Sequence, residues 1–149
     1  MGFADDIGRF AKKASALPNV VVRNIVIDVG QRVISRTPVG NPNLWQSKPP
    51  AGYVGGHARF NWSYSMNTRV IQELDGIDTS PGGAATLQRL TGAVPLIPGD
   101  AVHYIQNSVP YILKLEDGTG SPGQAPNGMV AVTAAEFQGV VSEQVRKVQ

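Results

Sequence analysis

Cysteine is absent from the chain, which excludes structural disulfides and thiolate metal sites. No apolar run reaches the roughly 18 residues that a membrane-spanning helix needs, so we expect no membrane partner. The first residues, MGFADDIGRFAKK, lack the apolar core of a signal peptide. We therefore expect a protein of cytoplasmic origin.

Charge is also scarce, and it is spread along the chain. Charged residues make up 16% of the sequence, below the roughly 25% of average proteins. Some surface that would normally be charged is therefore expected to be covered by other subunits. The net charge is +2, and no basic run exceeds the pair Lys12 and Lys13. Nucleic-acid binders concentrate positive charge on one face, so this pattern argues against DNA or RNA as the main ligand.

Glycine and proline are abundant instead, with 17 and 11 residues in a chain of 149. This composition predicts a single domain over 1–149 with many loops. The longest predicted loop, 37–56, exceeds the length of about 12–15 residues above which irregular segments are usually functional. A second predicted loop, 119–127, contains no charged residue.

Two N-terminal helices are predicted, separated by Pro18 and Asn19. The first covers 3–17, where apolar residues recur on one helical face: Phe3, Ile7, Phe10, Ala14 and Leu17. The second covers about 16 residues and stops at Thr37-Pro38. Asp28, Arg32 and Arg36 form i, i+4 pairs in this helix. Its β-branched content would also suit a buried strand.

Three strands are predicted at 57–67, 69–74 and 101–108, with a short helix at 84–90. The first strand alternates aromatic and polar residues, as a half-buried antiparallel strand does. A long C-terminal helix is predicted from Val130 onward, because apolar residues recur at helical spacing: Val130, Ala134, Phe137, Val141, Val145 and Val148. The predicted fold is α+β, a small antiparallel sheet packed with N-terminal and C-terminal helices and joined by long loops.

No motif for catalysis, cofactor binding or metal binding is recognised, so we expect a protein that is not an enzyme and has no cofactor. His57 and His103 lack a neighbouring acid at metal-ligand spacing. Glu116 and Asp117 are interpreted as a solvated helix end. The segment GTGSPGQAPNG lacks the spacing of a P-loop or a Rossmann turn.

The residues leave two functions open, an enzymatic one and a nucleic-acid-binding one. A small hydrolase would use His57 and one of the serines. A single-strand nucleic-acid binder would stack bases on aromatic side chains, with Arg59 and Arg69 nearby. The candidate stacking residues are Trp62, Tyr64, Tyr104 and Tyr111.

Four sequence blocks resemble a family of tail-completion, or neck, proteins of tailed bacteriophages. The blocks are SRTPVG, PAGYVGGHARFNWSYS, YIQNSVPYILKLEDG and QAPNGMVAVTAAEF. They match a helix ending in Thr-Pro, a segment with Arg and Trp, an Asn-x-x-Pro-Tyr segment running into Leu-Glu-x-Gly, and a Gln-Ala-Pro-x-Gly-Met entry to the last helix. The chain departs from the family by inserting residues 41–56 before this Trp.

The resemblance implies a non-catalytic virion protein at the head-to-tail junction, assembled in the cytoplasm of the host. It would form a ring, expected to contain six copies, that contacts the tail tube, the head connector or both, with genomic DNA only as passing cargo. The low charge of the 119–127 loop suits contact with a neighbouring subunit. The predicted interface residues are Gly118, Thr119, Gln124, Ala125, Pro126, Trp45 and Tyr53.

Overall fold

The computed structural model describes residues 3–40, 48–118 and 125–149, without the side chains of residues 3 and 6–16. The chain has an α+β fold with a small antiparallel sheet and helices at both ends, as predicted. Its elements are α1 (Phe3–Arg36), α2 (His57–Phe60), β1 (Ser63–Met66), η2 (Pro81–Gly83), α3 (Ala84–Ala93), β2 (His103–Gln106), α4 (Ile112–Glu116), α5 (Val130–Ala135) and α6 (Phe137–Lys147).

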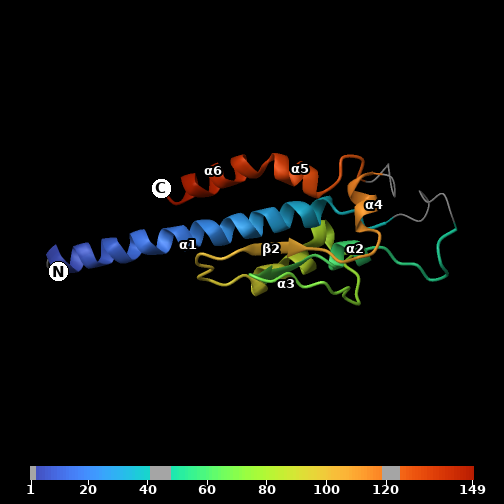
Figure 1. Cartoon of the computed structure of the whole chain (residues 1–149), viewed down its shortest axis with the longest axis horizontal. Helices are drawn as coiled ribbons and strands as arrows, with labels where there is room; N and C mark the ends of the chain where they lie inside the picture. Colours follow the sequence, from blue (N-terminus) through green and yellow to red (C-terminus); the bar gives the residue numbers. More distant parts are fainter. Residues whose placement is uncertain (1–2, 41–47, 119–124) are drawn as a thin grey trace.

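Helix α1 is the central layer (Figure 1). Helices α5 and α6 lie along one side of it, and the sheet and α3 lie along the other. Strands β1 and β2 pair antiparallel, with Ser63 opposite Gln106 and Met66 opposite His103. The two outer layers are therefore joined mainly through α1.

Helix α1 runs without interruption through Pro18, so the predicted break there is wrong. Proline lacks the N–H that would bond to the carbonyl four residues earlier, so the helix passes through exposed Pro18 with this one hydrogen bond unmade. Asn19 is also held from outside the helix, because its side-chain oxygen accepts a hydrogen bond from the Gly99 N–H at 3.0 Å. The predicted end of the helix before Thr37-Pro38 is confirmed, and the alternative of a buried strand is wrong.

The strand predicted at 57–67 is confirmed only for Ser63–Met66, because His57–Phe60 forms the one-turn helix α2. Gly56 precedes α2 with a φ of 103°, a left-handed conformation that redirects the chain. The turn brings the Phe60 ring against the Arg89 guanidinium, whose central carbon lies 4.2 Å from the ring centroid. The aromatic alternation was therefore misread as one continuous strand.

Residues 69–74, all within the described part of the chain, do not form the predicted strand. Side chains bind this segment instead. The Val70 N–H donates to the Gln106 side chain at 3.0 Å, and the Leu74 N–H donates to the Asn61 side chain at 2.7 Å. Asn61 also donates to the Leu74 carbonyl at 3.1 Å. Side-chain amides thus satisfy backbone groups that a third strand would have paired with backbone.

The helix predicted at 84–90 is confirmed as α3, and the strand predicted at 101–108 is confirmed in its centre as β2. Buried Asp78 fixes the start of α3 by accepting the Thr86 N–H at 2.9 Å and the Ser80 N–H at 2.8 Å. Burial opposes ionisation of this carboxyl group, but the hydrogen bonds from Ser80 and Thr86 outweigh it and lower the pKa of Asp78 to about 2.

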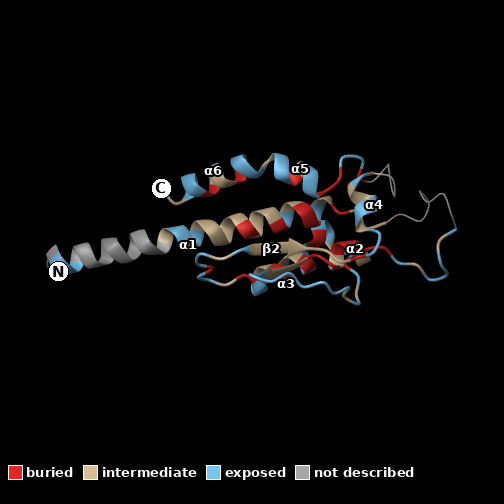
Figure 2. Cartoon of the chain, in the orientation of Figure 1, coloured by how far each residue is buried: buried red, intermediate tan, exposed pale blue. Residues whose placement is uncertain are grey.

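The hydrophobic core lies between α1, α3 and the sheet, and includes Val26, Val33, Ile34, Trp62 and Leu90. Figure 2 shows buried residues concentrated there, whereas α5 and α6 are largely exposed. Gly30 allows the close approach of α3 to α1, since a Cβ at this position would lie 2.9 Å from a Leu90 methyl carbon.

The single long C-terminal helix predicted from Val130 is instead two helices that meet at Glu136. Glu136 has a ψ of −5°, which departs from helical geometry and separates α5 from α6. The apolar stripe predicted for this region therefore continues across a break in the helix.

Glu116 ends α4, as predicted, but its carboxylate has a structural partner. It accepts the N–H groups of Met129, Val130 and Ala131 at 2.8, 2.9 and 2.8 Å, and so caps α5. Burial opposes ionisation, but these three bonds outweigh it and lower the pKa of Glu116. The contact joins the two ends of the 119–127 loop.

Candidate functional site

Polar side chains of α5 and α6 form hydrogen bonds with α1. Glu136 accepts hydrogen bonds from Arg32 and, at 2.5 Å, from Arg36. The Arg36 guanidinium also donates to Thr133 Oγ1 at 2.8 Å, and the Gln144 amide donates to Asp28 at 3.1 Å. We call this set of contacts the polar seam.

Ion pairing favours the charged forms of the side chains in the polar seam. The hydrogen bonds from Arg36 and Arg32 lower the pKa of Glu136. The hydrogen bonds to Asp28 and Glu136 raise the pKa of Arg32. Asp28 and Arg32 also form the predicted i, i+4 pair, at 2.8 Å.

The apolar stripe of the C-terminal helices is not fully covered by the rest of the chain. Val130, Phe137 and Val145 keep between 37% and 48% of their surface exposed, and Ala134 is exposed as well. The buried face of α6 is formed by Val140 and Gln144. The stripe was correctly recognised as an apolar face of helical residues, and the structure leaves it only partly buried.

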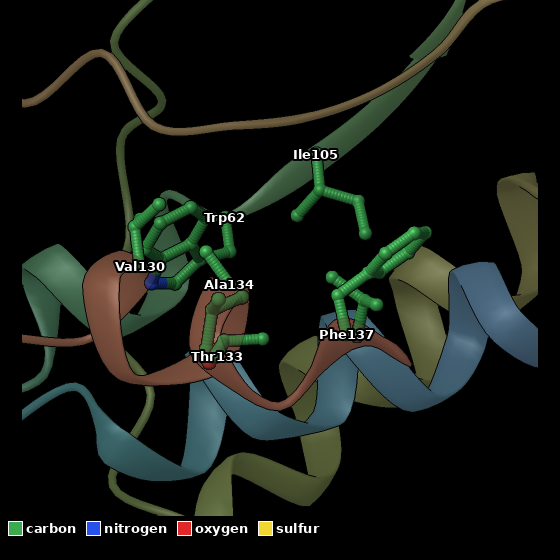
Figure 3. A pocket seen from close by; sticks show the side chains of 8 residues that line it. Trp62, Ile105, Val130, Thr133, Ala134 and Phe137 are labelled. Carbon is green, nitrogen blue, oxygen red and sulfur yellow. The ribbon is translucent and has the colours of Figure 1, made fainter. Parts of the chain in front are cut away.

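Part of the stripe forms one wall of an apolar groove (Figure 3). The floor of the groove comes from Val29 and Val33 of α1. Trp62 and Ile105, from the sheet side, form the second wall. The groove has a volume of about 340 Å³, and α5 and the start of α6 contribute Val130, Thr133, Ala134 and Phe137. We call it the α5 groove.

Residues from the sequence blocks that resemble the phage family form hydrogen bonds around Trp62, in the second wall of the groove. The Trp62 ring N–H donates to Thr37 Oγ1 at 2.7 Å, and the Thr37 carbonyl accepts from Arg59 Nε at 3.1 Å. Asn107 adds a third link, since its amide donates to the Ala58 carbonyl at 2.7 Å. These contacts give three of the sequence blocks a packing role that orders one side of the groove.

Four of the seven predicted interface residues lie within the described part of the chain. Trp45, Thr119 and Gln124 are outside it. Ala125 is buried in the core, so its side chain presents little surface to a partner. Pro126 is exposed and Gly118 is partly exposed.

Tyr53, the last predicted interface residue, is partly buried, and burial raises the pKa of its phenol. An interface role for Gly118, Pro126 and Tyr53 stays a prediction. The α5 groove was not predicted. Its signal in the sequence was the polar series Thr133, Glu136 and Gln144, which follows helical spacing and marks the face turned toward the arginines of α1.

His57 does not have the environment that the hydrolase alternative requires. Its Nε2 contacts the Glu73 carboxylate at 2.8 Å, and its Nδ1 contacts the Gly76 carbonyl at 2.7 Å. The hydrogen bond with Glu73 raises the pKa of His57. A ring that faces acceptors at both nitrogens favours the charged form and has no lone pair directed at a serine hydroxyl. This geometry gives the hydrolase no support.

The aromatic residues named for single-strand binding do not form one exposed surface. Trp62 is buried, whereas Tyr64 and Tyr104 are partly buried on the sheet and Tyr111 is exposed beyond it. Tyr64 is also engaged, because its hydroxyl lies 2.8 Å from His103 Nδ1. Arg59 is buried and directed at backbone carbonyls. The nucleic-acid alternative therefore gains no support from these positions.

Searches of the described residues give two further findings. No helix among them is long and apolar enough to cross a membrane. No group of three or more His, Asp or Glu side chains in this part of the chain is arranged to hold a metal ion.

Comparisons of the chain with models of protein families, with curated proteins and with solved structures find no match. The resemblance to phage tail-completion proteins therefore stays a prediction based on the sequence blocks.

Proposed function

We propose that this chain is a non-catalytic structural subunit of a tailed-phage virion, located at the junction of head and tail. Copies of the chain form a ring, expected to number six, that ends the tail tube or joins it to the head connector. The genome passes the ring as cargo. This proposal carries forward the function implied by the sequence blocks.

The α5 groove is the observation that supports an assembly role most directly. It places exposed apolar side chains of α5 and α6 beside Trp62 and Ile105, on a chain that is poor in charge. Apolar surface of this kind, rimmed by polar residues, is typical of a site that contacts another protein. The polar seam leaves the stripe partly exposed, because its hydrogen bonds attach α5 and α6 to α1 through polar side chains that are not part of the stripe.

Deletion of the gene in the phage that encodes this chain tests the location. We expect separate heads and tails in the lysate, with joined particles restored when the chain is supplied from a plasmid. Electron microscopy of complemented particles should place the chain as a ring at the junction. Intact infectious particles that lack the chain would contradict the proposal.

A substitution in the groove tests the surface. Ala134→Lys places a charge against the apolar wall, so we expect it to prevent complementation while unfolding at the temperature of the unaltered chain. Ser142→Lys is the matched control, because Ser142 is exposed on α6 and does not line the groove. Equal complementation by both variants would remove the groove from the proposal.

A further inference from the structure

The loop between α3 and β2 presents two adjacent apolar side chains to solvent. Leu96 and Ile97 keep 77% and 76% of their surface exposed. Pro95 and Pro98 flank them, and each proline ring fixes its own φ, so this part of the loop has little conformational freedom. We call the pair the Leu96–Ile97 knob.

The base of the knob is attached at several points. Val94 and Pro98 are buried. The Gly99 N–H donates to the Asn19 side chain at 3.0 Å, and the Val102 N–H donates to the Asn67 side chain at 3.1 Å. The Asn67 N–H returns a bond to the Val102 carbonyl at 2.8 Å. A loop fixed in this way holds the two apolar side chains outward.

The knob does not line the α5 groove of its own chain. Its attachment at Asn19 is about 15 Å along α1 from Val29 on the groove floor, at a rise of roughly 1.5 Å per residue. The two features are therefore separate surfaces of one molecule. A contact between two different surfaces repeats from copy to copy, and it closes into a ring when the rotation between copies allows.

We propose that the Leu96–Ile97 knob of one copy binds in the α5 groove of the next copy. This inference rests on the proposed function and names the contact between neighbouring subunits. A groove of about 340 Å³ holds roughly ten water volumes, which is room for a few aliphatic side chains rather than a helix. Both surfaces are apolar, so the contact removes exposed hydrophobic area from water on each side.

Charge at the two surfaces is complementary. Exposed Asp100 follows the knob, and the last turn of α6 carries Arg146 and Lys147. An extended chain spans about 10 Å from Ile97 to Asp100. Helical rise separates Phe137 from Arg146 by roughly 14 Å. A knob seated beside Phe137 therefore brings Asp100 toward Arg146 of the other copy.

Engineered disulfides test this contact directly, because the chain has no cysteine of its own. Ile97→Cys and Ala134→Cys are made as separate variants, one with a mass tag, and both are supplied during assembly of complemented particles. Oxidation should link a tagged copy to an untagged copy. The double variant should give a ladder of linked chains that ends at the copy number of the ring. Ile71→Cys paired with Ala134→Cys is the control, since Ile71 is exposed but lies outside the knob.

Charge exchange provides a second measurement. Asp100→Arg or Arg146→Asp alone should weaken association of the purified chain by about tenfold, and the two together should restore it. Neither residue is in the core, so folding should be unaffected.

The outcomes separate this inference from the proposed function. If particles contain the chain at the junction but give no link between positions 97 and 134, the inferred contact is wrong and the proposed function still stands. A link from position 134 to another virion protein, or to the N-terminal helix of a neighbouring copy, also overturns the inferred contact. Absence of the chain from virions overturns the proposed function itself.

Discussion

Helix α1 contacts its two neighbouring layers through different chemistry. Toward α3 and the sheet it buries Val26, Val33 and Ile34. Toward α5 and α6 it presents Arg32 and Arg36, which pair with Glu136. The first side is held by apolar burial, whereas the second adds the polar seam to the buried Val140 of α6.

The two sides of α1 are expected to contribute unequally to the free energy of folding. Burial of apolar side chains gives most of the free energy of folding. Ion pairs that remain partly in water contribute little. We therefore expect the layer of α3 and the sheet to determine the stability of the chain, and the layer of α5 and α6 to open at lower cost. The weaker attachment leaves the apolar stripe free for another protein.

The largest effect is expected from Ile34→Ala on the apolar side. Ile34 is fully buried, and its truncation leaves a cavity between α1 and Gly83. The free energy of unfolding should fall by about 2–5 kcal/mol in denaturant titrations. Ile71→Ala, at an exposed position, should change it by less than about 0.5 kcal/mol. Equal decreases in the free energy of unfolding for the two variants would show that Ile34 is not part of the core.

Asp78→Asn should have the next largest effect, because it weakens the start of α3. The pKa of Asp78 falls from 3.8 to about 2 on folding, which corresponds to a contribution of about 2 kcal/mol to stability. Since the folded pKa is the lower one, this contribution is complete above roughly pH 4 and is lost as the pH falls toward 2. Thermal unfolding should separate the two proteins at pH 7 and bring them together near pH 2. A constant difference across this range would argue against an ionised Asp78.

Glu116→Gln should cost less, about 1 kcal/mol, as expected for a helix cap. Its folded pKa is also lowered, so the stabilisation is present above the unfolded pKa and is lost in acid as the pH falls through the folded value. Hydrogen exchange should increase first at Met129, Val130 and Ala131. Unchanged exchange at these three amides would mean that the cap is not formed in solution.

Glu136→Gln should have the smallest effect on global unfolding, because the pairs of the polar seam are partly exposed. Its effect should appear as faster hydrogen exchange in α5 and α6 with little change in α3. Added salt should speed exchange in the unaltered chain and reduce the difference between the two proteins. An equal increase in hydrogen exchange in α3 would contradict the expectation that α5 and α6 open at lower cost than α3 and the sheet.

Elements were predicted correctly where the local sequence pattern and the surroundings in the fold favour the same structure. The end of α1 at Thr37-Pro38, helix α3 and the α+β class were predicted from stop signals and periodicity. Pro18 was misjudged because an exposed proline can lie within a long helix at the cost of one backbone hydrogen bond. The strand at 69–74 was misjudged because Asn61 and Gln106, distant in sequence, supply its hydrogen bonds.

The candidate site was harder to predict, because periodicity identifies an apolar face but not the surface that covers it. The stripe that begins at Val130 was predicted on a helix packed against the sheet. Arg32 and Arg36 instead select the opposite, polar face of α5 and α6, and this preference depends on a partner about 100 residues away in sequence. Trp62 was recognised as core or interface, and it serves in both the core and the groove wall.

The position of α1 also has a consequence during synthesis of the chain. The helix is synthesised before the layers that pack against it, yet it is the central layer of the finished molecule. Ile34 is made before Leu90 and Met129, its companions in the core, and Arg32 is made before Glu136. At roughly 5–20 residues per second, α1 waits about 5–20 s for the C-terminal helices. During that interval its apolar residues lack the partners that bury them in the fold, so a chaperone that binds nascent apolar helices should associate with α1 before the fold is complete.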